Sequence, residues 1–348
     1  WHAMPHNAEL ATMAPETIRA AIGVTHAVDD ELSVPRKKVA SQRDVPGLPR
    51  AVIPLMKSEG VVAISVGANG AVIAPNVPPV FIAKDGEPAN KAAAVASAAA
   101  RRAGLNVSAP SGQEMLMLFH PNGYGKVPPL GAPAGSKSQP GGPAASKGNQ
   151  NRAPDYAQLP GCSTVVVYAW RKDNSGPPNA TEVMSDFADA GAWFPGATVV
   201  AGTFDEFVDE AIASGATSGL PTISSDLSDS WLMGMPSDPV KLQRMRAVDR
   251  AVAAADRPQP PSAAMANFSR QFIKAGEHTW GLSHRGWPKT GILVSGWDNE
   301  DFHARIRADD TPQYSAMAAS WQEQRDWALE YPLEALRQVP ANSEVEGE

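Results

Sequence analysis

The feature that most constrains the fold of this chain is an alternation of short apolar runs with amphipathic helical patterns. Five runs are rich in β-branched and other apolar residues, and turn residues flank them, as is typical of buried strands. These runs are Val61–Val66, Val80–Ala83, Met115–Phe119, Thr164–Tyr168 and Thr198–Val200. Because helical patterns lie between them, residues 50–212 predict a parallel α/β architecture, either an open sheet or a barrel.

The helical segments carry recognisable start and stop signals. Ala51–Glu59 and Asn90–Ala103 each run into a glycine, which favours a helix C-terminus. Thr203 and Glu206 have the spacing of a capping box, and Asp238 stands as an N-cap before a proline. After about residue 238 the pattern is mainly helical, and one apolar stripe at helical spacing predicts a buried face. The stripe consists of Leu242, Met245, Val248 and Val252.

These patterns divide the chain into three regions. Residues 1–237 carry the α/β pattern, residues 238–340 are predicted to be helical, and residues 341–348 form a Glu-rich tail that we expect to be disordered. Pro128–Pro160 is rich in Pro, Gly, Ser and Ala and has almost no large apolar residue, so it predicts a flexible insertion. The chain starts at Trp1 without a Met or a leader pattern, which predicts that it is a piece of a longer protein.

Composition narrows the classes of function. The 348 residues have a formal net charge of −7, which argues against a nucleic-acid partner. No apolar run approaches the ~18 residues of a membrane span. A single cysteine, Cys162, excludes an intrachain disulfide and any site built from several cysteines. Nine tryptophans against five tyrosines are a surplus often associated with stacking against sugars, whereas packing in the core is the more common role of any single tryptophan. The sequence leaves the oligomeric state and the compartment, secreted or cytoplasmic, open.

Four short segments carry side chains suited to chemistry. Trp1–Asn7 holds two imidazoles, including His2, and Asp44 lies on a sharp turn before a helix. Asp173 and Asn174 closely follow a predicted strand, and catalytic groups of α/β barrels lie at the carboxyl ends of strands. Glu277–Gly281 combines an acid, an imidazole and an indole. Each residue also has an ordinary structural explanation, such as a turn, a cap or a core histidine.

Taken together and in order, the segments resemble the catalytic region of the glycoside hydrolase family 38 α-mannosidases, and more closely a branch of α-mannosidase-like proteins. Asp44–Gly60 resembles the family's Asp-Pro-Phe-Gly-His segment, and Gly202–Phe207 resembles its Gly-Thr-Leu-Ser-Asp-Tyr segment. Leu220–Pro239 is similar to the stretch that ends in Trp-x-Gly and a turn into a helix. Glu277–Gly281 falls where the family carries its late metal-binding histidine. The resemblance covers about residues 1–330.

The resemblance implies a distorted seven-stranded β/α barrel of the glycoside hydrolase and deacetylase type, incomplete at its N-terminus and followed by a helical bundle. It implies a divalent metal, usually zinc, with His2 and His278 among its ligands, and a retaining mechanism with two carboxyl groups. The catalytic residues would be Asp173, as acid and base, and Asp44, in the floor of the site. The residues implied in substrate binding are Trp231, Asp229, Asn174, Tyr124 and Trp280.

The sequence thus predicts a metal-dependent glycoside hydrolase that acts on α-linked sugars. Two alternatives remain open. The family's nucleophile is an Asp in the segment that resembles Trp1–Glu9, where the nearest acid is Glu9, so a non-catalytic carbohydrate-binding relative is the first alternative. The second alternative is a metal-dependent carbohydrate deacetylase, in which a metal-activated water replaces the carboxylate nucleophile.

Overall fold

The computed structural model describes residues 1–45, 47–68, 76–86, 112–120, 156–168, 177–227, 235–254, 262–279, 281–282, 299–309 and 312–337. The chain forms two compact units. The first, which we call the α/β unit, comprises Trp1–Asn7 and Thr25–Ser230. The second, which we call the helical unit, comprises Ala8–Val24 and Trp231–Glu348. Helix α1 (Pro15–Glu31) contributes residues to both units.

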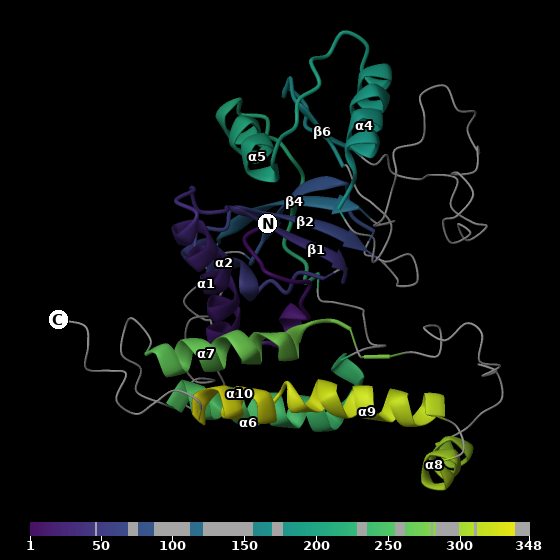
Figure 1. The fold of residues 1–348 in the computed structure, drawn as a ribbon. Coiled ribbons are helices and arrows are strands. Elements are labelled where there is room, and N and C mark those ends of the chain that lie inside the picture. The colour runs from purple at the N-terminus through teal and green to yellow at the C-terminus, as the bar shows by residue number, and fades with distance from the viewer. Residues whose placement is uncertain are drawn as a thin grey trace. The chain divides into compact units, whose positions relative to one another are not determined.

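The α/β unit is built on a mixed, mostly parallel sheet of five strands in the order β1-β2-β4-β3-β7 (Figure 1). The pairs β1–β2, β2–β4 and β3–β7 are parallel, and β3–β4 is antiparallel. A separate antiparallel pair joins β5 and β6. The strands are β1 (Val39–Asp44), β2 (Ala63–Ala68), β3 (Val80–Lys84), β4 (Glu114–His120), β5 (Tyr156–Gln158), β6 (Val165–Val167) and β7 (Thr222–Ile223).

The predicted α/β class with a mostly parallel sheet is therefore confirmed. In the described part of the chain the sheet is open, with β1 and β7 at its edges, so a closed seven-stranded barrel is not observed there. Four of the five predicted strands are present, as β2, β3, β4 and β6. The prediction of a strand at Thr198–Val200 is wrong, because this segment pairs with no described strand and Val200 is 73% exposed.

Helices lie on both faces of the sheet, with α5 (Phe204–Ala213) on one side and α2 (Val52–Ser58) on the other (Figure 1). The other described helices of this unit are α4 (Ala180–Trp193) and the part of α1 that belongs to it. The predicted capping box of α5 is confirmed. Thr203 Oγ1 accepts from the Glu206 N–H at 3.2 Å, and Glu206 Oε2 accepts from the Thr203 N–H at 2.6 Å.

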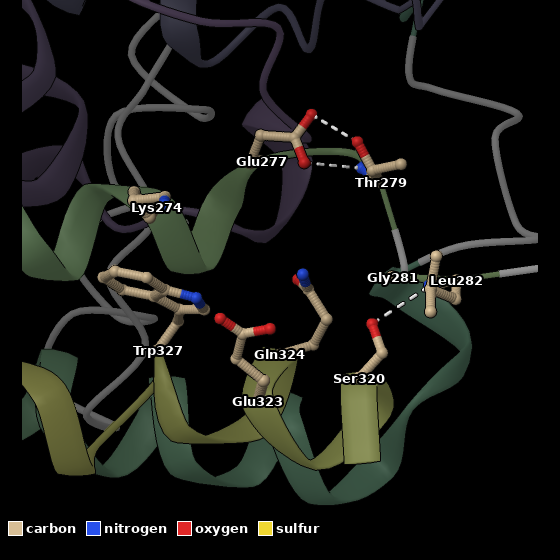
Figure 2. Close-up of a pocket in the computed structure, with 9 residues that line it drawn as sticks. All are labelled: Lys274, Glu277, Thr279, Gly281, Leu282, Ser320, Glu323, Gln324 and Trp327. Carbon is tan, nitrogen blue, oxygen red and sulfur yellow. Dashed lines mark hydrogen bonds between the residues drawn. The ribbon is translucent and has the colours of Figure 1, made fainter. Parts of the chain in front are cut away.

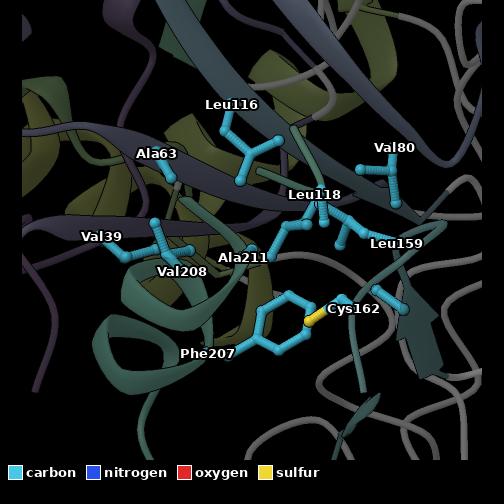
Figure 3. Close-up of a cluster of buried hydrophobic side chains, with 12 residues drawn as sticks. Val39, Ala63, Val80, Leu116, Leu118, Leu159, Cys162, Phe207, Val208 and Ala211 are labelled. Atoms are coloured by element: carbon cyan, nitrogen blue, oxygen red, sulfur yellow. The ribbon is translucent and has the colours of Figure 1, made fainter. Parts of the chain in front are cut away.

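The core of the α/β unit lies between the sheet and α5. Figure 3 shows Phe207, Val208 and Ala211 of α5 facing the strands. In β4, Leu116 and Leu118 belong to this cluster, as the two-residue period of a strand requires. The side chains that lie between and beside these two leucines in β4 are also buried, and they point to the opposite face of the sheet. Strand β4 is therefore apolar on both faces. The run of apolar residues that predicted this strand follows from burial on both faces.

The N-terminal segment covers the outer edge of β1. The Ala3 N–H donates to the Val39 carbonyl at 3.0 Å, and Asn7 Oδ1 accepts from the Arg43 N–H at 2.8 Å. Asp205 Oδ1 accepts from the Val39 N–H at 2.8 Å. All three bonds pair backbone groups that an uncovered edge strand would leave unpaired. The bonds of Ala3 and Asn7 fix the segment Trp1–Asn7 along β1. They also hold His2 near the strand.

In its described residues, the helical unit consists of helices and short 3₁₀ turns. Asp238 Oδ1 accepts from the Val240 N–H at 2.8 Å and from the Lys241 N–H at 3.2 Å, which confirms the predicted N-cap. The elements after α1 are η2 (Met235–Ser237), α6 (Pro239–Ala254), α7 (Ala263–Phe272), η3 (Ile273–Gly276), α8 (Asn299–Ala308), α9 (Pro312–Asp326) and α10 (Glu330–Arg337), and η1 (Leu10–Thr12) precedes α1.

The core of the helical unit joins α6, α7 and the segment that leads into α10. The predicted apolar stripe of α6 packs here, since Met245 and Val248 are buried against Phe268 and Phe272 of α7. Leu242 and Val252 pack against the same cluster. A smaller cluster joins α8 to α9. None of the described helices is long and apolar enough to cross a membrane.

Three predictions concern residues that the structure does not describe. The helix predicted at Asn90–Ala103 lies outside the described residues, as does the tail at 341–348. Residues 128–155 of the predicted insertion also lie outside them, and the residues near its end form β5.

Candidate functional site

The carboxyl ends of β1, β2 and β4 lie at one edge of the sheet. Strand register places Asp44 beside Ala68, and Gly67 beside His120. In open α/β sheets, ligands bind at this edge. Asp44 is half-buried at the end of β1, and its φ of 74° lies in a region that few residues other than glycine adopt. Aspartate is among the few that tolerate it, which explains its place at this turn.

Arg43, near the end of β1, is linked to the middle of β2 from within the core. Its Nη1 donates to the Ser65 carbonyl at 3.1 Å, and its Nη2 donates to Ser65 Oγ at 3.2 Å. Its guanidinium lies 5.9 Å from the ring centroid of Tyr168. A buried guanidinium held by several hydrogen bonds has a fixed position next to the turn at Asp44.

Tyr168 lies at the end of β6 and keeps its proton at neutral pH. Burial raises the pKa of its hydroxyl to about 12, and the charge of Arg43 and a hydrogen bond with Ser65 only partly oppose this effect. Its ring lies 5.4 Å from that of Phe204, the first residue of α5. Tyr168 therefore brings a neutral hydroxyl into the cluster around Arg43.

His2 also packs against Phe204, and the centroids of the two rings lie 5.4 Å apart. Burial lowers the pKa of its imidazole to about 4, and the positive charges of the N-terminus and Arg43 add to the effect. His2 is therefore neutral at pH 7. A neutral imidazole can accept a proton or bind a metal.

In the helical unit, Glu277 organises the segment that follows η3. Its Oε1 lies 2.7 Å from His278 Nδ1 and accepts from Thr279 Oγ1 at 2.7 Å. Its Oε2 accepts from the Thr279 N–H at 3.0 Å. Burial alone would raise the pKa of Glu277, but the bonds from His278 and Thr279 outweigh burial and lower it to about 2. Glu277 is therefore ionised at neutral pH.

His278 is 7% exposed and has its Nδ1 beside this carboxylate. Metal-binding histidines commonly have one ring nitrogen oriented in this way by a carboxylate, which leaves the other nitrogen for the ion. The metal-binding role that the resemblance implies for His278 stays a prediction. Glu277 also lines a cavity of about 360 Å³ within the helical unit.

The structure describes three of the predicted site residues. His2 and Asp44 belong to the α/β unit, and His278 belongs to the helical unit. The other six predicted residues lie outside the described residues; they are Asp173, Asn174, Tyr124, Asp229, Trp231 and Trp280.

The predicted zinc was tested against the donors present. Among the described residues, no group of three or more His, Cys, Asp or Glu side chains could hold a metal ion. A catalytic zinc usually has three protein ligands. The described residues by themselves do not fit a zinc site, and no step below depends on the metal.

The sequence alone did not single out Arg43, Tyr168 or Lys241. Lys241 is fully buried, and its Nζ donates to Gln324 Oε1 at 3.2 Å. The available signal for Arg43 was its position one residue before Asp44. Tyr168 ends a predicted strand, where a functional residue is often found. The burial of these side chains depends on partners far away in the chain.

Residues 235–347 match the profile of a domain of unknown function (DUF5054). The match covers less than half of the chain and falls within the helical unit. It includes Glu277 and His278 together with the cavity beside them. No curated protein and no solved structure matches the chain.

Proposed function

We propose that the chain is a glycoside hydrolase-like protein of the α-mannosidase type that acts on α-linked sugars. One observation carries the proposal: the carboxyl edge of a mostly parallel sheet holds Asp44, next to a buried Arg43 whose charge helps to keep His2 neutral. Carboxylates at this edge are suited to glycoside chemistry, which needs two carboxyl groups around the scissile bond. The order of the segments that resemble α-mannosidases supports the same assignment.

The finer architecture is part of this proposal. The sheet would belong to a distorted seven-stranded β/α barrel, followed by a helical bundle. Its support is the run of parallel strands β1, β2 and β4, with α2 forming the crossover between the first two. Such crossovers are the building units of parallel barrels and of open parallel sheets alike.

The proposed chemistry gives each residue a distinct task. Asp173 would give its proton to the leaving oxygen while a second carboxylate, which is not assigned among the described residues, bonds to the anomeric carbon; Asp173 would then take a proton from the water that breaks this bond. Asp44 would accept hydrogen bonds from sugar hydroxyls at the floor of the site. Arg43 would act as a positioning residue, because its hydrogen bonds end on Gln42 and Ser65 and its charge acts on His2.

The direct test is hydrolysis of 4-nitrophenyl α-D-mannopyranoside by the protein and its variants. We expect nitrophenolate release, and a loss of roughly 10²-fold or more in kcat/KM for Asp173→Asn, since general acid catalysis contributes this much. Asp189→Asn, an exposed carboxylate on α4, serves as the matched control and should leave the rate unchanged. An N-acetylated aminosugar substrate tests the deacetylase alternative. No release from the mannoside would contradict the proposal.

A second candidate is a carbohydrate-binding protein without turnover. It is favoured by Glu9, the one acid in Trp1–Glu9, because Glu9 is only 1% exposed. A nucleophile must reach the anomeric carbon of a bound sugar, and a carboxylate with this burial does not reach an external ligand. This candidate predicts saturable sugar binding with no product.

A further inference from the structure

A cavity of about 360 Å³ lies within the helical unit, between the segment after η3 and helix α9 (Figure 2). Glu277 and Thr279 form one side of it, and Ser320, Glu323 and Gln324 of α9 form the other. Its volume lies in the range of small-molecule sites, roughly 300–1,000 Å³. None of these cavity residues has a task in the proposed hydrolysis.

A hydrogen bond from Lys241 fixes the orientation of the Gln324 amide. Lys241 is fully buried and its ammonium can only donate, so it holds Gln324 by the carbonyl oxygen at 3.2 Å. The amide nitrogen of Gln324, which lines the cavity, is thereby left to donate. The hydrogen bond from buried Lys241 therefore orients the Gln324 amide so that its nitrogen can donate to a ligand.

The wall at Gly281 is held tightly against α9. Gly281 has a φ of 78°, and a Cβ at this position would lie 2.7 Å from Ser320 Oγ, so only glycine fits here. The Leu282 N–H donates to the same Ser320 Oγ at 3.1 Å. Because that hydroxyl accepts from Leu282, its own hydrogen can be donated to a ligand.

The remaining side chains balance the charge of the cavity. Lys274 Nζ lies 3.8 Å from the ring centroid of Trp327 and covers one face of the indole. The ammonium groups of Lys241 and Lys274 match the carboxylates of Glu277 and Glu323 in number. The lining itself holds one ammonium group, Lys274, and two carboxylates, and the buried Lys241 behind Gln324 offsets the second carboxylate. The cavity together with this supporting lysine therefore carries no net charge, which favours an uncharged ligand with many hydroxyl groups over a cation or an anion.

We propose that this cavity binds an uncharged polyhydroxylated ligand of monosaccharide size. The Glu323 carboxylate would accept from its hydroxyls, and the Gln324 amide and Ser320 hydroxyl would donate to them. The rim of Trp327 would supply apolar contact.

Titration calorimetry and saturation-transfer NMR on the intact protein test this with two probes, methyl α-D-mannopyranoside and myo-inositol. We expect saturable binding of at least one probe. Glu323→Gln should weaken the affinity about tenfold, because it removes one hydrogen bond to a charged group. Glu330→Gln, an exposed acid on α10, is the matched control and should leave the affinity unchanged. Binding of the mannoside alone identifies a sugar, and binding of the inositol identifies a wider class of polyols.

Three outcomes overturn the proposal: no saturable binding of either probe, equal binding by Glu323→Gln and the control, or tighter binding of glucosamine or gluconate than of the neutral probes. Glu323 is exposed, so its substitution should not impair folding. Hydrolysis of the nitrophenyl mannoside by Glu323→Gln should equal that of the unmodified protein. A protein that binds these probes but hydrolyses nothing leaves this proposal standing and removes the proposed hydrolase.

Discussion

At the scale of single residues, the charge of Arg43 opposes protonation of His2 in the α/β unit. Arg43 keeps its guanidinium charge and is held by Ser65, whereas His2 is neutral at pH 7 because its pKa is lowered to about 4. The imidazoles of Trp1–Asn7 could be singled out from the sequence. Arg43 could not, since its burial depends on a partner on the neighbouring strand.

The lowered pKa of His2 predicts a loss of stability in acid. In the unfolded chain the imidazole takes up a proton below its ordinary pKa of 6.5, whereas the folded chain does so only near pH 4. The unfolded state binds more protons between these values, so the free energy of unfolding falls as the pH drops from 6.5 to 4. At pH 4.5 this amounts to at most about 2.5 kcal/mol.

Urea unfolding at pH 7 and pH 4.5 measures this effect. We expect His2→Gln to lose less stability between the two pH values than the unmodified protein does. His303→Gln, which removes an exposed histidine on α8, should behave like the unmodified protein. An unchanged pH dependence in His2→Gln would show that His2 titrates normally in the folded chain.

At the scale of elements, the sequence predicted those strands and helix ends that depend on residues close together in the chain. The apolar runs gave β2 and β4 because both faces of these strands are buried, and the capping box gave the start of α5. Thr198–Val200 has the same composition as those runs but forms no strand in the structure. A strand needs a partner, and the three-residue run contains no information about one.

Asp238, at the start of α6, makes a helix cap and an ion pair whose contributions to stability can be separated by mutation. Asp238 caps the helix through Oδ1 and lies 2.7 Å from Arg325 Nε through Oδ2. Asp238→Ala removes both interactions and should lower the free energy of unfolding by about 3 kcal/mol. Asp238→Asn keeps a capping oxygen and should cost about half as much. Urea unfolding of the two variants measures the difference, and equal losses would mean that the cap contributes nothing.

At the scale of the whole molecule, the sequence predicted a mostly parallel α/β region and a helical region, and both are present. Closure of the sheet could not be derived in the same way, because it depends on pairing between strands that are far apart in the chain. The candidate site shows the same division. Asp44 and His278 were found as chemistry-bearing residues in short motifs, whereas the Lys241–Gln324 contact, which joins two helices, has no local signal.

The central claim is that the protein cleaves α-linked sugars with retention of configuration. Proton NMR of the intact protein incubated with 4-nitrophenyl α-D-mannopyranoside tests it directly, because it identifies the anomer that is released first. A retaining mechanism with two carboxyl groups predicts α-mannose as the first product, followed by slow equilibration with the β-anomer. Initial release of β-mannose would contradict the mechanism, and the absence of any free mannose would contradict the hydrolase assignment itself.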